Sequence, residues 1–121
     1  MKSQQIIDYG KPLSSTKTER PVPSGTQVLV SVNSCGVCHS DLHLQDGFFE
    51  LGNDRKLDTT GRRVLPFTLG HEIQGIVHSI GPDVNEIDIG QECVVFPWIG
   101  CGKCQHCDRG VENQCPRNLS L

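Results

Sequence analysis

Residues 101–107 have the sequence CGKCQHC, and a fourth cysteine, Cys115, follows after seven further residues. Zinc is bound tetrahedrally by four thiolates, and spacings this short let a single loop fold around the ion. Four thiolates leave no open coordination position, so the pattern predicts a structural metal site and not a catalytic one. The ion would contribute folding free energy to a segment that has almost no apolar residues of its own.

Two other uses of these cysteines compete with zinc. An iron–sulfur cluster also takes four cysteines, and cysteines without metal can be reactive or form disulfides. The chain has an odd total of seven cysteines, and Met1–Tyr9 lacks the apolar run of a signal peptide. We therefore expect a cytoplasmic protein with reduced thiols, in which a cysteine cluster is more often a metal site. His106 lies inside the cluster and is expected at the surface, because four cysteines suffice.

The composition is that of a globular protein. The 121 residues are 36% hydrophobic and 21% charged, with a net charge of −3, which fits one domain of ordinary size. Like charges do not gather in runs, and no window is apolar enough to span a membrane. Neither nucleic acid nor a membrane is therefore expected as a partner.

Thirteen glycines and seven prolines interrupt the sequence at short intervals, and no long helical period is present. The pattern predicts a mainly β fold with short helices. A helix is expected over Ser40–Gln45, with Ser40 or Asp41 as its cap. Loops are expected over residues 14–23 and 50–66 and from residue 100 onward. The expected strands are Ile6–Ile7, Thr26–Val32, Ile73–Ile80 and Cys93–Phe96.

A second segment with two cysteines, Cys35–His43, follows the strand expected over Thr26–Val32. It contains the Cys-x-x-Cys pattern of redox pairs and the Cys-x-x-Cys-His pattern of c-type haem attachment. In a third interpretation, one cysteine is a zinc ligand beside a hydroxyl and an imidazole that move protons. The lack of an export signal, and of any methionine except Met1, disfavours haem. A redox pair usually lies in a βαβ unit, which is not found here. The zinc interpretation is favoured by the His71–Glu72 pair just before the strand expected over Ile73–Ile80.

Three segments in the same order resemble the zinc-dependent medium-chain alcohol dehydrogenases: GVCHSDLH at 36–43, GHE at 70–72 and the four-cysteine segment. The resemblance runs from about Val28 to Cys115 and includes IGPDV at 80–84 and Gly90. It implies a GroES-like, partly open β-barrel over residues 1–121, with a protruding structural-zinc lobe at about 99–116. It also implies oxidation of a primary or secondary alcohol to an aldehyde or ketone, with NAD or NADP as cofactor.

The resemblance assigns two sets of zinc ligands. Cys38 and His71 would bind a catalytic zinc, and Glu72 would be a carboxylate able to approach it. Asp41 would orient His71. The ligands of the structural zinc would be Cys101, Cys104, Cys107 and Cys115.

The resemblance also assigns a path for the proton released by the alcohol. Ser40 would take the proton and His43 would pass it to solvent, since a histidine titrates near neutral pH. His39 would contact the pyrophosphate of the cofactor. Cys35 and Cys93 match no ligand position, and we expect them to be small buried hydrophobic residues.

The family pattern extends beyond this chain. A nucleotide-binding domain with a glycine-rich turn, and a third ligand of the catalytic zinc, would follow the lobe, whereas the sequence ends at Leu121. We therefore expect a fragment that binds one zinc firmly and a second weakly, and that does not oxidise alcohols alone. The alternatives are a non-catalytic zinc-binding remnant and an electron carrier with c-type haem.

For the full-length enzyme, the expected partner is a small-molecule alcohol or carbonyl substrate. Many members of the resembled family are homo-oligomers, and the sequence leaves the oligomeric state of this one open. Phe48, Phe49 and Trp98 are candidates to line a substrate pocket, and ordinary core or surface positions explain them equally well.

Overall fold

The computed structural model describes residues 1–120. Contacts within the chain divide it into two compact units. The first unit comprises Met1–Val22 and Val37–Gly70, and the second comprises Pro23–Gly36 and the described chain from His71 onward. Within the described part of the chain, no helix has the length and apolar character needed to cross a membrane.

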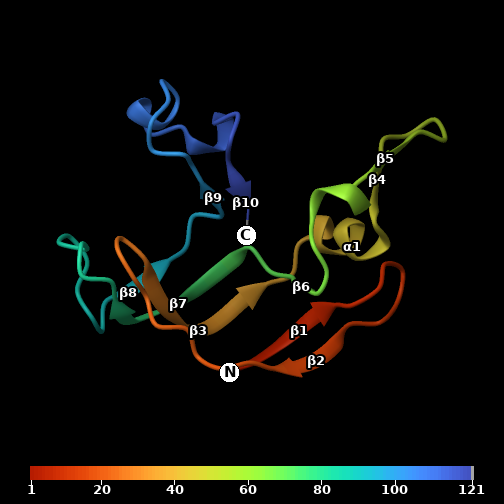
Figure 1. Ribbon diagram of the computed structural model, residues 1–121. Helices are drawn as coiled ribbons and strands as arrows, with labels where there is room; N and C mark the ends of the chain where they lie inside the picture. Colours follow the sequence, from red (N-terminus) through yellow and green to blue (C-terminus); the bar gives the residue numbers. More distant parts are fainter. Residues whose placement is uncertain (121) are drawn as a thin grey trace. The chain divides into compact units, whose positions relative to one another are not determined.

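The first unit contains a three-stranded antiparallel sheet in the order β2–β1–β6 (Figure 1). Two hydroxyls reinforce the pairing of the polar strand β2 with β1: the oxygens of Ser3 and Thr16 lie 2.8 Å apart. Thr16 also donates a hydrogen bond to the side-chain oxygen of Gln5 at 2.8 Å. Ile6, the last residue of β1, is buried. The strands are β1 (Lys2–Ile6), β2 (Ser14–Lys17) and β6 (Phe67–Thr68).

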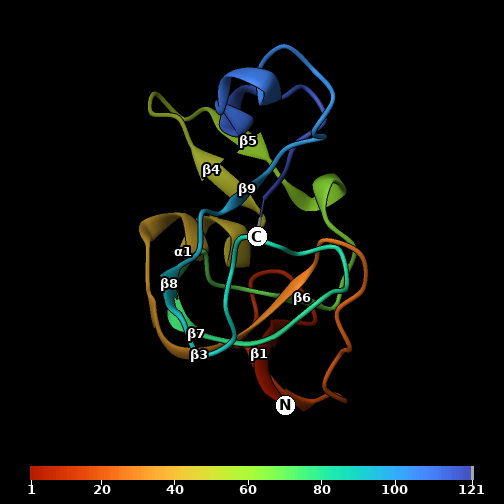
Figure 2. The same ribbon diagram turned by 90° about the vertical axis from the view of Figure 1, so that its left-hand side faces the viewer.

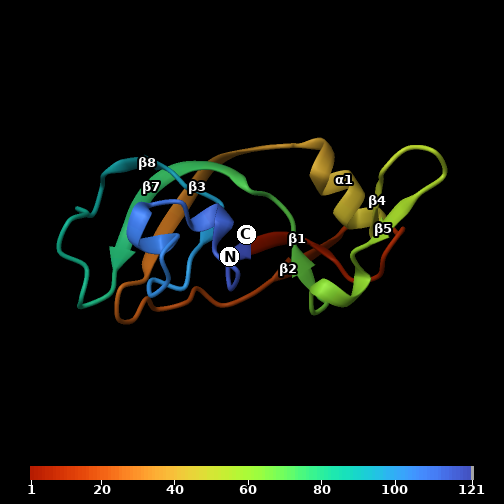
Figure 3. The same ribbon diagram turned by 90° about the horizontal axis from the view of Figure 1, so that it is seen from above.

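A helix followed by a hairpin forms the other part of the first unit, and Figure 3 shows α1 beside β4 and β5. The helix ends at Gly47, whose φ of 85° is a left-handed conformation that favours glycine. A Cβ at Gly47 would lie 2.9 Å from the Thr60 methyl group and 3.2 Å from the Tyr9 ring. Only glycine therefore lets the chain turn so closely into the hairpin. The elements are α1 (His39–Asp46), β4 (Phe48–Glu50), β5 (Lys56–Asp58) and the 3₁₀ helix η1 (Thr60–Arg62).

The second unit is built on an antiparallel sheet in the order β3–β7–β8 (Figure 1). The central strand β7 contains Val77, one of the few fully buried apolar side chains. β3 and β7 approach each other closely at Gly75: an added Cβ would collide with the Ser31 carbonyl oxygen and lie 2.7 Å from the Val30 side chain. The strands are β3 (Val28–Gly36), β7 (Glu72–Ile80) and β8 (Glu92–Val94).

The second unit also contains the four-cysteine lobe, residues 98–120, whose first and last strands form a short antiparallel pair. Figure 2 shows its two single-turn helices, coloured blue. Cys115 is the only fully buried residue between 98 and 119. The lobe therefore has almost no apolar core of its own. Its elements are β9 (Trp98–Ile99), η2 (Cys107–Arg109), η3 (Glu112–Gln114) and β10 (Leu119–Ser120).

The prediction of a mainly β fold with short helices is confirmed. The strands expected over Thr26–Val32, Ile73–Ile80 and Cys93–Phe96 correspond to β3, β7 and β8, with ends that differ by up to four residues. The helix expected over Ser40–Gln45 corresponds to α1, which is one residue longer at each end and has Cys38 as its N-cap. The predicted caps, Ser40 and Asp41, lie inside the helix and are wrong.

All three segments predicted as loops contain strands. Residues 14–23 include β2, residues 50–66 include β5 and η1, and the segment from residue 100 onward includes η2, η3 and β10. The hairpin is stabilised by Lys56, whose Nζ lies 3.3 Å from a Glu50 carboxylate oxygen and 3.8 Å from the centre of the Phe48 ring. Such short strands depend on cross-strand partners, which a local sequence pattern does not show.

We expect replacement of Gly75 by alanine to destabilise the β3–β7 pair, because the new methyl group has no space beside Ser31. Overpacking of this kind lowers the free energy of unfolding by about 2 kcal/mol. Gly61 provides a matched control, since no atom lies within 4 Å of a Cβ placed there. Urea unfolding of Gly75→Ala and Gly61→Ala checks the prediction, and equal stabilities would contradict it.

Candidate metal centres

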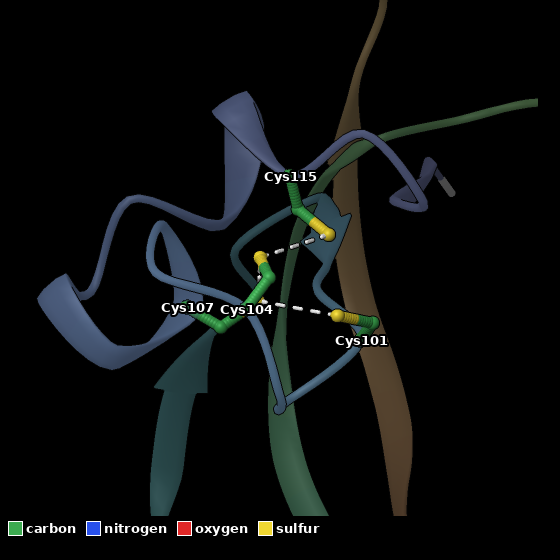
Figure 4. Close-up of side chains that lie close together, drawn as sticks. All are labelled: Cys101, Cys104, Cys107 and Cys115. Atoms are coloured by element: carbon green, nitrogen blue, oxygen red, sulfur yellow. Dashed lines mark hydrogen bonds between the residues drawn. The ribbon is translucent and has the colours of Figure 1, made fainter.

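Four cysteine side chains of the lobe point toward one another (Figure 4). Their sulfur atoms all lie within 4.8 Å of one another. The separations are 4.0 Å for Cys101–Cys107, 3.6 Å for Cys104–Cys107 and 3.8 Å for Cys104–Cys115. No disulfide joins these four residues. The structure thus brings together all four residues predicted as ligands of a structural zinc.

The sulfur spacing fits a single tetrahedral ion. Zinc–sulfur bonds of about 2.3 Å at tetrahedral angles place the sulfurs about 3.8 Å apart. The observed separations of 3.6, 3.8 and 4.0 Å bracket that value. An iron–sulfur cluster places several atoms between its cysteine ligands and needs the sulfurs farther apart. The geometry therefore favours one ion over a cluster.

The surroundings of the Cys101 sulfur favour the thiolate form that a metal requires. A hydrogen bond from the Lys103 backbone lowers the pKa of Cys101 to about 6 from its ordinary value of 9.0, and burial opposes this change. Smaller contributions in the same direction come from Cys115, Arg117 and Cys104. At neutral pH the Cys101 sulfur is thus mostly a thiolate, ready to bind a cation.

Glycine lets the lobe close around these sulfurs. A Cβ at Gly100 would lie 2.6 Å from the Cys107 sulfur and 2.7 Å from Cγ of Glu112. Gly102 and Gly110, with φ of 66° and 70°, adopt the left-handed conformation within the loop. The backbone can therefore approach the sulfur cluster where a larger residue could not.

In the first unit, Cys38 occupies the N-cap position of α1. Its backbone N–H donates a hydrogen bond of 2.9 Å to Oδ2 of Asp41. Asp41 is only 6% exposed, so this bond fixes the start of the helix from within the unit. The residue predicted to orient His71 therefore also holds the backbone of the predicted ligand Cys38.

The histidines predicted to act in proton transfer and cofactor binding stack on α1. The ring centroids of His39 and His43 lie 4.5 Å apart, at an interplanar angle of 18°. His43 also contacts Phe49 of β4, with 4.8 Å between the ring centroids. Ser40 lies in the first turn of the same helix. The stack holds the His43 imidazole between a helical neighbour and the hairpin.

In the second unit, His71 directly precedes β7 and Glu72 is its first residue. Glu72 pairs in register with Gly36, the last residue of β3. A Cβ at Gly36 would collide with the Glu72 carboxylate and lie 3.2 Å from Cδ of Glu72. Gly36 is therefore the residue that lets this carboxylate lie across the end of β3.

Comparison with known proteins identifies the family. The model of the alcohol dehydrogenase GroES-like domain matches residues 24–121. This chain belongs to that family. The GroES-like class predicted from the resemblance is thereby confirmed.

Individual relatives agree with the family match. This GroES-like chain is 42% identical over 123 aligned residues to an NAD-dependent alcohol dehydrogenase of Saccharolobus solfataricus. It is 35% identical over 119 residues to an alcohol dehydrogenase of Geobacillus stearothermophilus. The crystal structure of the alcohol dehydrogenase of Aeropyrum pernix is similar, with a TM-score of 0.83 at 28% identity.

The relatives are longer than this chain. The alignment with the Saccharolobus protein covers 100% of this GroES-like chain and 35% of the relative. The alignment with the Aeropyrum structure covers 100% of this chain and 33% of that one. The chain thus spans about a third of the length of the proteins that it matches.

The structure of the GroES-like chain also shows the two cysteines outside the predicted metal sites and the aromatic residues predicted near a substrate pocket. Cys35 is exposed, so its prediction as a buried hydrophobic residue is wrong, and Cys93 is half-buried. Trp98 lines an open cavity of about 400 Å³ on the lobe, together with Phe96 and Ile99. Phe48 and Phe49 belong to the other compact unit, so a pocket shared with Trp98 stays a prediction.

Sequence reasoning missed Arg117, Gly36 and Gly100. Arg117 contacts two sulfurs of the lobe, at 3.4 Å in each case. Its position two residues after the last cysteine is the only signal in the sequence. Gly36 and Gly100 directly precede or closely adjoin predicted ligands, but only the structure shows what a side chain there would meet.

We expect the GroES-like chain to lose its bound metal when a lobe cysteine is replaced. Cys115→Ser removes one of four thiolates from a cluster whose geometry fits a single ion, and bound zinc should fall far below one per chain. Cys93→Ser removes a half-buried thiol outside the cluster and should retain the metal. Elemental analysis after gel filtration checks this, and equal zinc contents would contradict it.

Proposed function

We propose that this chain is the zinc-binding part of a zinc-dependent alcohol dehydrogenase. In the full-length enzyme it would oxidise a primary or secondary alcohol to an aldehyde or ketone with NAD or NADP. The observation that carries the proposal is the spacing of the four lobe sulfurs, which fits one zinc ion in a chain of the alcohol dehydrogenase GroES-like family. That zinc would be structural, because four thiolates complete its coordination.

A second, catalytic zinc is proposed with Cys38 and His71 as ligands and with Glu72 as a carboxylate able to approach it. Gly36 and Glu72 are register partners at the end of the β3–β7 pair. Cys38 lies two residues beyond Gly36, a reach of at most about 7 Å, and His71 directly precedes Glu72. Covalent geometry therefore keeps both ligands close to this strand end. A third permanent ligand would come from outside these three residues, and water or substrate would fill the open position.

Zinc at such a site supplies Lewis-acid chemistry that lowers the pKa of an alcohol hydroxyl. Bound NAD or NADP would supply the hydride acceptor for the oxidation, and the residues of α1 would take up the proton that the alcohol releases. Ser40 would accept the proton and pass it to His43, which would release it to solvent. The contacts of His43 with His39 and Phe49 support this role, because they hold the imidazole in one orientation.

The cofactor proposal rests on relatives and on His39. A related putative zinc-binding dehydrogenase from Sinorhizobium meliloti is described as bound to NADP, at 32% identity. A related dehydrogenase from Escherichia coli is described as complexed with NADH, at 30% identity. His39, exposed at the start of α1, would offer a hydrogen bond to the cofactor pyrophosphate.

We also propose the further domain, the substrate, the assembly and the compartment with which this chain would work. A nucleotide-binding domain would supply most of the cofactor site, so the chain alone would bind zinc without oxidising alcohols. The substrate would be a small alcohol or carbonyl compound, and the full-length enzyme would assemble as a homo-oligomer in the cytoplasm. The rival function is that of a zinc-binding module without catalysis, and it predicts no alcohol-dependent reduction of a nicotinamide.

The test measures alcohol-dependent reduction of NAD and NADP by the complete protein product of the gene. His43→Gln should lower kcat about a hundredfold, because it removes a group that transfers the proton. Small imidazole buffers should restore part of the rate, which separates a proton-transfer role from a structural one. His78→Gln, a change of the same type at an exposed position of β7, serves as the control and should leave kcat unchanged.

Two results would overturn the proposal. A complete product that reduces neither cofactor with any alcohol would support the non-catalytic module. A His43→Gln variant with the full rate would remove His43 from the proton path.

A further inference from the structure

Arg117 contacts the first and the last cysteine of the lobe at the same time. Its guanidinium Nη2 donates a hydrogen bond of 3.4 Å to the sulfur of Cys101. Its backbone N–H donates a second hydrogen bond, also of 3.4 Å, to the sulfur of Cys115. One residue therefore connects two sulfurs that are fourteen positions apart in the sequence.

The turn after Cys115 directs Arg117 toward the cluster. The backbone N–H of Asn118 donates to the Cys115 carbonyl oxygen at 3.1 Å, which closes the turn. The Asn118 side chain donates to the Asn113 carbonyl oxygen at 3.2 Å and ties the turn to η3. Pro116 lies between Cys115 and Arg117, and its fixed φ restricts the backbone of this turn. The position of Arg117 is thus set by local structure on both sides.

The positive charge of Arg117 is opposite in sign to the net charge of the proposed zinc site. Four thiolates around a divalent cation carry a net charge of −2, which must be stabilised by nearby dipoles or cations. Hydrogen bonds from a cation to an anion are stronger than those between neutral groups. Arg117 supplies one positive charge and two donors, and among the described residues it is the one whose side-chain cation is bonded to a lobe sulfur.

We propose that Arg117 is a positioning residue that holds the Cys101 and Cys115 thiolates around the structural zinc and slows loss of the ion. The inference rests on the proposed structural zinc and extends it to a residue outside the ligand set. Release of the metal requires one thiolate to move away first. Arg117 restrains both ends of the ligand-bearing segment, so each of these thiolates must break a hydrogen bond to leave.

The test compares rates of zinc transfer from the loaded chain to an excess of the chelator pyridylazo-resorcinol. Removal of a residue that orients metal ligands weakens metal binding by at least about tenfold, so Arg117→Gln should release zinc about tenfold faster. Arg117→Lys keeps the charge but loses the planar donor group, and its rate should be intermediate. Arg109→Gln makes the same charge change on η2 in the same lobe, and it should release zinc at the rate of the unmodified chain.

A second readout separates positioning from general stability. In the cobalt-loaded chain, the thiolate-to-cobalt charge-transfer band should move to lower energy in Arg117→Gln. A sulfur that accepts fewer hydrogen bonds gives up an electron more easily. The band should stay unchanged in Arg109→Gln.

The outcomes distinguish this inference from the function on which it rests. Equal release rates for Arg117→Gln and the unmodified chain, or equal acceleration in Arg109→Gln, would overturn the role of Arg117 alone. If Arg117→Gln cannot be loaded, Arg117→Lys decides: faster release supports the role and unchanged release overturns it. An unmodified chain that holds no zinc would overturn the structural-zinc proposal and this inference together.

Discussion

The short distance between four sulfurs is the constraint on which the lobe depends. Sulfur separations of 3.6 to 4.0 Å fit a single ion, and four thiolates this close would repel one another without a cation between them. Apolar packing does not hold the lobe together, since Cys115 is its only fully buried residue between 98 and 119. Gly100, the left-handed glycines and Arg117 all serve the same cluster, which explains why a segment so poor in apolar side chains has a defined loop path.

A second constraint is the pairing of Gly36 with Glu72, where β3 ends and β7 begins. The chain leaves this pair in two directions, toward Cys38 at the start of α1 and toward His71. Strand register thus places the segments that carry the proposed catalytic ligands at one end of a sheet. Gly75 and Gly36 allow the close approach of β3 and β7 on which that register rests. The position of the Glu72 carboxylate in the proposed site therefore depends on the glycines that let β3 and β7 pair closely.

The sequence predicted the elements whose cause is local and failed where the cause is a distant partner. β7 was predicted within one residue, because its apolar pattern and the following Gly81 are local signals. β2 was missed because Ser14–Lys17 is polar and pairs only through partners on β1. Cys35 was expected inside, yet it lies exposed near the end of β3. Spacing alone predicted that the four lobe cysteines gather, as the structure shows. Arg117 needed coordinates, since its contacts depend on a turn that the sequence does not specify.

One zinc ion is proposed to organise the lobe. X-ray absorption at the zinc edge, recorded on the purified chain, measures its ligands directly. We expect a first shell of four sulfurs at about 2.3 Å, with no nitrogen or oxygen required to fit the data. A shell containing nitrogen or oxygen ligands in place of sulfur would contradict a four-cysteine site. A sample whose bound metal is iron and not zinc would contradict the identity of the ion.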